Sequence, residues 1–209
     1  MPEFPLVLQR CALVVNDFMQ WMVEPTSPAY TPAGAIAIER LLPLLAFCRE
    51  QGIPTAFGLL PPGAIRIPDP SGRPPDPALY RLADRLGRAP GDLVFVKPLL
   101  PSGHLPVSGL WQGTPLDAYL RERGRDTVLV AGATTQWGVD TTIREGANRG
   151  YQIVALYDCC VTRPMDDRGW GAVAVESVEP VFFTAWAYWF ARLMTAAEAL
   201  AELRAQVPR

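Results

Sequence analysis

One segment limits the fold of this chain more than any other: residues 127–149, with the sequence TVLVAGATTQWGVDTTIREGANR. It begins with a short apolar run at 128–131, which predicts a strand. It ends with apolar residues at Val139, Ile143 and Ala147, whose spacing predicts a helix. A turn at 132–138 joins the two. A strand that leads directly into a helix points backbone N–H groups into the crevice above a parallel sheet. The segment therefore predicts an α/β protein with a ligand site at this turn.

The same alternation of strand and helix patterns extends along the whole sequence. Strands are predicted at 11–15, 55–60, 92–96, 128–131, 152–157 and 192–194, and helices at 34–51, 78–86, 116–123, 139–147, 170–190 and beyond Thr195. Such alternation is typical of a parallel sheet with helices on both faces. We therefore expect residues 1–209 to form a single Rossmann-like α/β domain with about six parallel strands.

Prolines and polar caps set the expected limits of the helices. Pro43 is predicted to kink or shorten the helix at 34–51, and Pro180 to interrupt the helix at 170–190. Thr114 and Pro115 are residue types preferred at the N-cap and the first position of a helix, and Thr195 is expected to cap the last helix. The 170–190 segment is apolar nearly all round, so it belongs either in a core or in an interface between subunits.

Composition and charge exclude several classes of protein. The chain has 209 residues, is 49% hydrophobic and carries a formal net charge of −2 without a long run of either sign. We therefore expect neither nucleic-acid nor membrane binding. The N-terminus lacks a signal-peptide pattern and the four cysteines lack paired spacing, which indicates a cytoplasmic protein with reduced thiols. No G-x-G-x-x-G follows the first strand and no P-loop is present, so we expect no cofactor.

Two loops rich in proline and glycine, at 61–77 and 98–113, are longer than plain connections. Loops of this length often act as lids or binding loops, and a surface loop without a role is the alternative. The second loop contains His104, the only histidine, which we interpret as a hydrogen-bonding residue rather than a catalyst.

Asp17, Lys97 and the 132–138 turn each follow the carboxyl end of a predicted strand. Because the carboxyl ends of parallel strands share one edge of the sheet, these three features are expected to converge on one crevice. Lys97 favours the charged form of Asp17, whereas apolar surroundings favour the neutral acid. The carboxyl group can thus be tuned to exchange a proton near neutral pH. A purely structural ion pair at the strand ends is the alternative.

Several segments resemble the isochorismatase-like, or cysteine hydrolase, family, and together they extend from about Cys11 to Leu203. They are ALVVNDFMQ at 12–20, GDLVFVKP at 91–98, GTPLDAYLRERGRDTVLVAGATTQWGVDTTIREGANRGYQIVALYD at 113–158 and MTAAEALAEL at 194–203. The resemblance implies a Rossmann-like fold, a homodimer or homotetramer, a small-molecule substrate and catalytic roles for Asp17 and Lys97. It also implies a non-proline cis peptide bond at Ala133–Thr134.

This chain departs from the family pattern at the nucleophile. Many members hydrolyse amides through a cysteine thioester, and their G-V-x-T-x-x-C motif falls on 132–138, where Gly138 stands in place of the cysteine. The four cysteines lie elsewhere in the sequence, at Cys11, Cys48, Cys159 and Cys160, the last two at a strand end. Without a thiolate, nucleophilic amide hydrolysis loses its first step. With a single histidine, the Asp/His metal site of nicotinamidases cannot be built, so no metal is expected.

A glycine at this position is similar to the isochorismatases proper, which hydrolyse an enol ether and release pyruvate without a covalent intermediate. This resemblance implies that Asp17 protonates the vinyl carbon and that Lys97 holds the acid or polarises a substrate oxygen. It also implies that N–H groups of residues 137–139 bind a carboxylate or the attacking water. The residues expected to bind substrate are Phe18, Gln20, Leu60, Trp111, Thr134, Trp137 and Gly138.

The residues around the motif indicate a substrate other than isochorismate itself. Isochorismatases carry an aromatic–small–His run before the glycine, where this chain has residues 134–137, and a glutamine where we align Leu60. Aromatic residues in place of polar contacts favour a bulkier natural-product intermediate, as in antibiotic biosynthesis or other secondary metabolism. Two alternatives remain open. One is an elimination, rearrangement or cyclisation by the same Asp/Lys pair, and the other is a non-catalytic relative that binds a ligand or partner.

Overall fold

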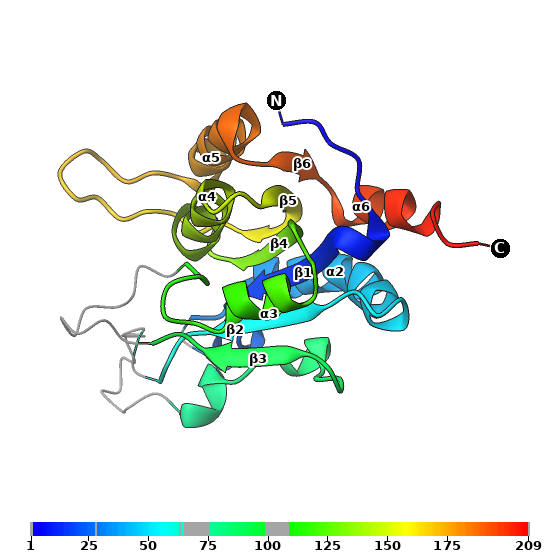
Figure 1. Cartoon of the computed structure of the whole chain (residues 1–209). Coiled ribbons are helices and arrows are strands. Elements are labelled where there is room, and N and C mark those ends of the chain that lie inside the picture. Colours follow the sequence, from blue (N-terminus) through cyan, green and yellow to red (C-terminus); the bar gives the residue numbers. More distant parts are fainter. Residues whose placement is uncertain (1, 28, 63, 65–75, 99–108, 209) are drawn as a thin grey trace.

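The computed structural model describes residues 2–27, 29–62, 64, 76–98 and 109–208 (Figure 1). The predictions for His104 and for most of the two long loops fall outside these residues. No helix in the described ranges has both the length and the apolar character needed to cross a membrane.

Six strands form one sheet in the order β3-β2-β1-β4-β5-β6, and every pairing is parallel. They are β1 (Cys11–Asn16), β2 (Thr55–Leu59), β3 (Leu93–Val96), β4 (Thr127–Ala133), β5 (Gln152–Val161) and β6 (Arg192–Met194). The chain order reverses between β1 and β4, which is the kind of position at which open α/β sheets bind their ligands. The predicted Rossmann-like fold with a six-stranded parallel sheet is confirmed.

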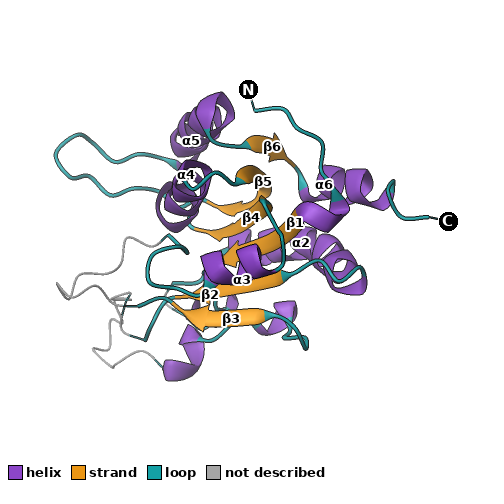
Figure 2. Ribbon diagram, viewed as in Figure 1, coloured by secondary structure: helices purple, strands orange, loops and turns teal. Residues whose placement is uncertain are grey.

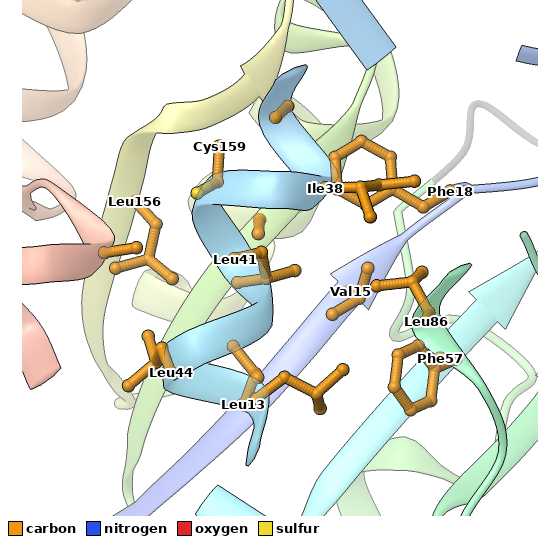
Figure 3. Close-up of a cluster of buried hydrophobic side chains, with 14 of the residues drawn as sticks. Leu13, Val15, Phe18, Ile38, Leu41, Leu44, Phe57, Leu86, Leu156 and Cys159 are labelled. Atoms are coloured by element: carbon orange, nitrogen blue, oxygen red, sulfur yellow. The ribbon is translucent and has the colours of Figure 1, made fainter. Parts of the chain in front are cut away.

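Helices cover both faces of this sheet (Figure 2). One face carries α2 (Pro32–Glu50) and α6 (Ala196–Arg204), and the other carries α3 (Leu116–Glu122), α4 (Asp140–Asn148) and α5 (Val175–Trp189). Successive side chains of a strand point to opposite faces, so Leu13 and Val15 of β1 join the core under α2, while Ala12 and Val14 join the second core. Figure 3 shows how Ile38 and Leu41 of α2 pack onto that first core.

The helix predicted at 78–86 is wrong. Two short 3-10 turns, η2 (Pro77–Tyr80) and η3 (Asp84–Leu86), take its place. Between them, the Ala83 N–H donates to the Phe18 carbonyl at 3.0 Å, and Leu82 forms an isolated bridge with Met19. Bonds to the segment that follows β1 therefore replace the bonds of a continuous helix.

β4 and β5 both extend further than predicted. Val130 pairs with Ala155, the register then shifts, and pairing resumes at Gly132 opposite Cys160. The apolar pattern does not reveal the extension of β5 because the charged residue Asp158 interrupts it. Cys159 and Cys160 lie at the end of β5, as predicted.

Neither internal proline ends its helix. α2 continues through Pro43, and α5 continues through Pro180 but begins only at Val175. α3 begins at Leu116, as predicted, but Pro115 is its N-cap rather than its first residue. The Thr114 hydroxyl still accepts the Leu116 N–H at 3.3 Å. The capping box predicted from Thr195 is confirmed, with Glu198 as its partner.

α5 lies at the surface although it is largely apolar. Only Val178 and Trp186 of this helix are buried, whereas Val181, Tyr188 and Trp189 are 65%, 64% and 80% exposed. The core position considered for 170–190 is therefore wrong for most of the segment. The alternative, an interface with another subunit, stays a prediction.

Candidate active site at the carboxyl edge of the sheet

The ends of β1, β2 and β3 place Asp17 beside Lys97. The Asp17 N–H donates to the Gly58 carbonyl at 2.9 Å, and the Lys97 N–H donates to the Leu59 carbonyl at 2.8 Å. Lys97 Nζ lies 2.5 Å from Asp17 Oδ2, and both side chains are almost completely buried. The convergence of these two residues, which are distant in sequence, is confirmed.

The backbone of Asp17 is held in a left-handed conformation, with φ at 53°. This conformation costs a residue other than glycine roughly 1–2 kcal/mol, although Asp and Asn tolerate it better than most. Backbone strain of this kind occurs often at functional sites, where the surrounding structure enforces it. Here the backbone bond to β2 and the pair with Lys97 hold the residue in place.

Opposing effects set the protonation of Asp17. Burial raises its pKa to about 6, against the lowering effects of Lys97 and of the hydrogen bond from Asn16. Oδ2 accepts both Lys97 Nζ and Asn16 Nδ2, the latter at 2.8 Å. Oδ1 is buried and has no hydrogen-bond partner among the described residues. Because donors stabilise negative charge on the oxygen they contact, the proton of the neutral acid belongs on Oδ1.

The turn after β4 reaches the same group of residues. A Cβ atom at Gly132, whose φ is 134°, would lie 2.1 Å from the Asn16 carbonyl oxygen, so only glycine lets β4 approach β1 this closely. The cis peptide bond at Ala133–Thr134 is confirmed. The Ala133 carbonyl then accepts Asn16 Nδ2 at 2.8 Å, which ties the turn to the residue next to Asp17.

A π-helical turn, η4 (Thr135–Val139), connects this strand to α4. The N–H groups of Trp137 and Val139 both donate to the Thr134 carbonyl, at 3.1 and 3.2 Å. The prediction that these two groups bind a substrate carboxylate or water is therefore wrong, because the wide turn already satisfies them. Gly138 is buried in this turn, and Trp137 is 51% exposed.

Two network residues were missed by sequence reasoning. Asn16 is completely buried at the end of β1, and Thr142 is completely buried on α4. The Thr142 hydroxyl lies 3.2 Å from Asn16 Oδ1 and 2.7 Å from the Gly138 carbonyl. A signal was present in the sequence, since an asparagine at the end of an otherwise apolar buried strand requires polar partners.

The four cysteines do not supply the thiolate that the turn lacks. All are free and buried. Burial raises the pKa of Cys11 to about 11 and that of Cys48 to about 12, and it raises the pKa of Cys159 and Cys160 as well. Cys160 pairs with Gly132 across the sheet, but its thiol donates to the Leu156 carbonyl at 3.3 Å. A protonated, buried thiol is a poor nucleophile.

Two of the aromatic residues predicted to bind substrate take part in core packing. Phe18 is completely buried in the core under α2 (Figure 3). Trp111 is buried in the opposite core, where its Nε1 donates to the Thr142 carbonyl at 2.7 Å and its ring centroid lies 4.8 Å from that of Tyr151. These contacts account for both residues without a substrate.

The remaining predicted binding residues have mixed surroundings. Gln20 begins the short helix α1 (Gln20–Val23), and its Oε1 accepts the Asp84 N–H at 3.1 Å. Leu60 directly follows β2 and is buried, and its N–H lies 3.3 Å from Met19 Sδ. Thr134 is 8% exposed and follows the cis peptide bond in the turn.

Other features of the described residues lie away from this site. No three His, Cys, Asp or Glu side chains of the described ranges group into a metal site. Two surface grooves of about 640 and 420 Å³ adjoin α5 and β6 rather than Asp17, and both are lined in part by Ala187 and Leu193.

Known proteins are similar to this chain over different parts of its length. Residues 11–184 match the model of the isochorismatase domain. Ureidoacrylate amidohydrolase RutB of Methylorubrum extorquens is 39% identical over 79 residues, which cover 38% of this chain and only 29% of that protein. Maleamate amidohydrolase of Pseudomonas putida is 24% identical over 168 residues, or 76% of this chain and 75% of that protein.

The same similarity appears in three dimensions. The crystal structure of a cysteine hydrolase from Pseudomonas syringae pv. phaseolicola superposes with a TM-score of 0.82 and 25% sequence identity, covering 97% of this chain and 96% of the other. An isochorismatase structure from Pseudomonas putida has a TM-score of 0.74 at 20% identity, over 94% and 93% of the two chains, and supports the fold alone. Because the family model matches most of the sequence, from β1 into α5, this chain belongs to the isochorismatase domain family.

Proposed function

We propose that this protein is a hydrolase that uses Asp17 as a general acid on an enol ether, such as isochorismate or a bulkier natural-product intermediate. The observation that carries the proposal is the carboxyl group of Asp17. It is buried, its pKa is raised to about 6, and it has one oxygen bound by two N–H donors and the other without a partner among the described residues. A proton donor works best when its pKa lies near the operating pH. Family membership supports hydrolysis as the reaction class.

The reaction follows from this arrangement. Oδ1 gives its proton to the vinyl CH2 carbon, and the carbon attached to the ether oxygen becomes an oxocarbenium ion. Water adds to that carbon, loses a proton to the Asp17 carboxylate and forms a hemiketal, which collapses into a ketone and an alcohol. Lys97, at 2.5 Å from Oδ2, stabilises the carboxylate that exists between the two proton transfers.

The substrate in this proposal lies over the turn. Trp137 offers a half-exposed aromatic face, Gly138 carries no side chain in the buried turn, and Thr134 and Leu60 border the strand ends. In this proposal, Gln20 binds the substrate from its position at the start of α1. Phe18 and Trp111 contribute through the packing that holds these segments.

Amide hydrolysis is the second candidate, and the relatives favour it. Both named relatives are amidohydrolases. Against a thioester route, the residue at the expected nucleophile position is Gly138 and the four thiols are buried with raised pKa values. We therefore favour the enol ether, because protonation by Asp17 requires no covalent intermediate.

Turnover assays separate the two candidates. The wild-type protein is incubated with isochorismate, with ureidoacrylate and with maleamate, while pyruvate and ammonia are measured separately. We expect pyruvate from isochorismate and no ammonia from either amide. Ammonia without pyruvate would replace the enol-ether proposal by the amide one. In Gly138→Cys, a gain of ammonia release would indicate that the rest of the amidase geometry is present.

Asp17→Asn tests the proposed acid directly. We expect kcat to fall by roughly 10²–10⁴-fold, the usual contribution of a general acid, while ligand binding survives. In the wild type, kcat should fall as the pH rises through about 6, because the carboxyl group must be protonated to donate. Asp92→Asn is the matched control, since the Asp92 side chain is also buried but pairs with Arg49. Equal losses in the two variants would show that stability, not acid catalysis, is affected.

A further inference from the structure

The side chain of Asn16 is oriented by its neighbours without ambiguity. Its amide nitrogen lies 2.8 Å from Asp17 Oδ2 and 2.8 Å from the Ala133 carbonyl oxygen. A carbonyl oxygen only accepts hydrogen bonds, and an ionised carboxylate does the same. Both hydrogens of the amide are thereby used, and the amide oxygen must face Thr142, whose hydroxyl lies at 3.2 Å. A flipped amide would set oxygen against oxygen at two contacts.

The Thr142 hydroxyl connects this amide to the rest of the site. It lies 2.7 Å from the Gly138 carbonyl and accepts the Leu110 N–H at 3.2 Å. Its single hydrogen is shared between two acceptors, the Gly138 carbonyl and Asn16 Oδ1. Asp17, the cis peptide and the Gly138 turn are thus joined through two fully buried polar side chains.

We propose that Asn16 is a positioning residue for Asp17: it fixes which carboxyl oxygen carries the proton and holds that carboxyl group in register with the 133–138 turn. The proposal rests on the role of Asp17 as an acid given above, and it adds the group that orients this acid. The second donor on Oδ2 keeps negative charge on that oxygen and leaves Oδ1 for the proton. Within the described residues, the charged group that acts on Asp17 is Lys97.

A network of this kind has consequences beyond the acid itself. The Ala133 carbonyl belongs to the peptide unit that precedes Thr134, and the Gly138 carbonyl belongs to the turn that would contact substrate. A movement of the turn therefore changes the hydrogen bond that Asp17 receives. Thr142 connects α4 to this network through its hydroxyl contacts with Asn16 and the Gly138 carbonyl.

The experiment measures Asp17 without a substrate. The carboxyl ¹³C resonance of Asp17, assigned by its absence in Asp17→Asn, is titrated by NMR in the wild type and in Asn16→Leu, which has a similar volume and no donor. We expect the midpoint to move upward by about one pH unit, because a donor to the charged oxygen is lost. An unchanged midpoint would overturn the proposal.

A second pair of variants keeps the test decisive if Asn16→Leu fails to fold. Thr142→Val removes the hydroxyl that holds the Asn16 amide and should move the Asp17 midpoint in the same direction by a smaller amount, while Thr142→Ser should restore it. Thr141→Val is the matched control, because its hydroxyl bonds the Trp137 carbonyl at 3.0 Å on the same helix but does not contact Asn16. Equal midpoints in Thr142→Val and Thr141→Val would contradict the network.

Failure of this proposal and failure of the proposed function give different results. If the midpoint moves in Asn16→Leu but Asp17→Asn retains full turnover, the positioning role stands and acid catalysis by Asp17 is lost. If turnover depends on Asp17 but the midpoint does not respond to Asn16, acid catalysis stands and the positioning role is lost.

Discussion

The carboxyl edge of the sheet buries polar and charged side chains, whereas the outer face of α5 exposes aromatic ones, and both arrangements are the reverse of the usual one. At the edge, Asn16, Asp17 and Lys97 are buried. On α5, Tyr188 and Trp189 are exposed to solvent. Buried ionisable groups and exposed aromatic patches each oppose stability or solubility, and each is more often a sign of function than a scattered surface residue.

The two regions differ in whether the chain itself supplies their partners, which are hydrogen-bonding groups at the sheet edge and covering apolar side chains on α5. At the sheet edge, nearly every polar atom of Asn16 and Asp17 has a partner, and the exception among the described residues is Asp17 Oδ1. On α5, Tyr188 and Trp189 stay exposed among the described residues. We propose that the first region acts on a small ligand, whereas the use of the second as an interface with another subunit stays a prediction.

The largest expected loss of stability comes from a substitution that prevents the close contact between β4 and β1. Gly132→Ala places a Cβ 2.1 Å from the Asn16 carbonyl oxygen, so the two strands must separate. We expect the free energy of unfolding in urea to fall by roughly 3–5 kcal/mol.

Gly150→Ala is the control for that substitution. Gly150 also has a positive φ, of +88°, but its Cβ would meet no atom within 4 Å. Only conformational strain of roughly 1–2 kcal/mol is expected there. Similar losses in the two variants would show that the close approach at Gly132 is not the cause.

A smaller effect is expected in the pH dependence of stability. The folded-state pKa of Asp17, about 6, lies above its ordinary value of 3.8, so its contribution to stability is complete below about pH 3.8 and is lost as the pH rises through about 6. The loss is on the order of 3 kcal/mol. It is measured as the difference in unfolding free energy between the wild type and Asp17→Asn from pH 4 to pH 8, which cancels the other carboxylates. A difference that stays constant with pH would contradict the raised pKa.

The smallest effect on stability is expected on α5. Tyr188 is exposed, so Tyr188→Glu should change the free energy of unfolding by no more than about 0.5 kcal/mol. We expect it to reduce the molar mass measured by sedimentation equilibrium, because the homodimer or homotetramer that the family resemblance implies would use this apolar face.

Trp170→Ser is the control for the α5 variant. Trp170 is 92% exposed, but it lies in the segment between β5 and α5 that projects from the body of the molecule (Figure 1). The molar mass of Trp170→Ser should equal that of the wild type. If the wild-type protein is monomeric at all concentrations tested, the prediction of a subunit interface on α5 is wrong.

Much of the fold and part of the site were predictable because they depend on local patterns and on the rules of parallel sheets. Apolar runs located all six strands, and a parallel sheet brings the carboxyl ends of its strands together. These two facts alone placed Asp17 beside Lys97. The segments at 78–86 and 152–161 were predicted less well, because contacts with residues distant in sequence decide where they bend or extend.

The sequence by itself determined the parallel α/β architecture, the pair of Asp17 and Lys97 at one edge, and the presence of glycine rather than cysteine at position 138. Only the tertiary structure decided that the N–H groups of Trp137 and Val139 bind the Thr134 carbonyl, and that the Asn16 amide donates to Asp17. Hydrogen-bond partners depend on distances of a few ångströms between segments that the sequence does not place. The exposure of α5 has the same origin, since an apolar helix is recognised from its residues, but what covers it depends on the packing of the whole molecule.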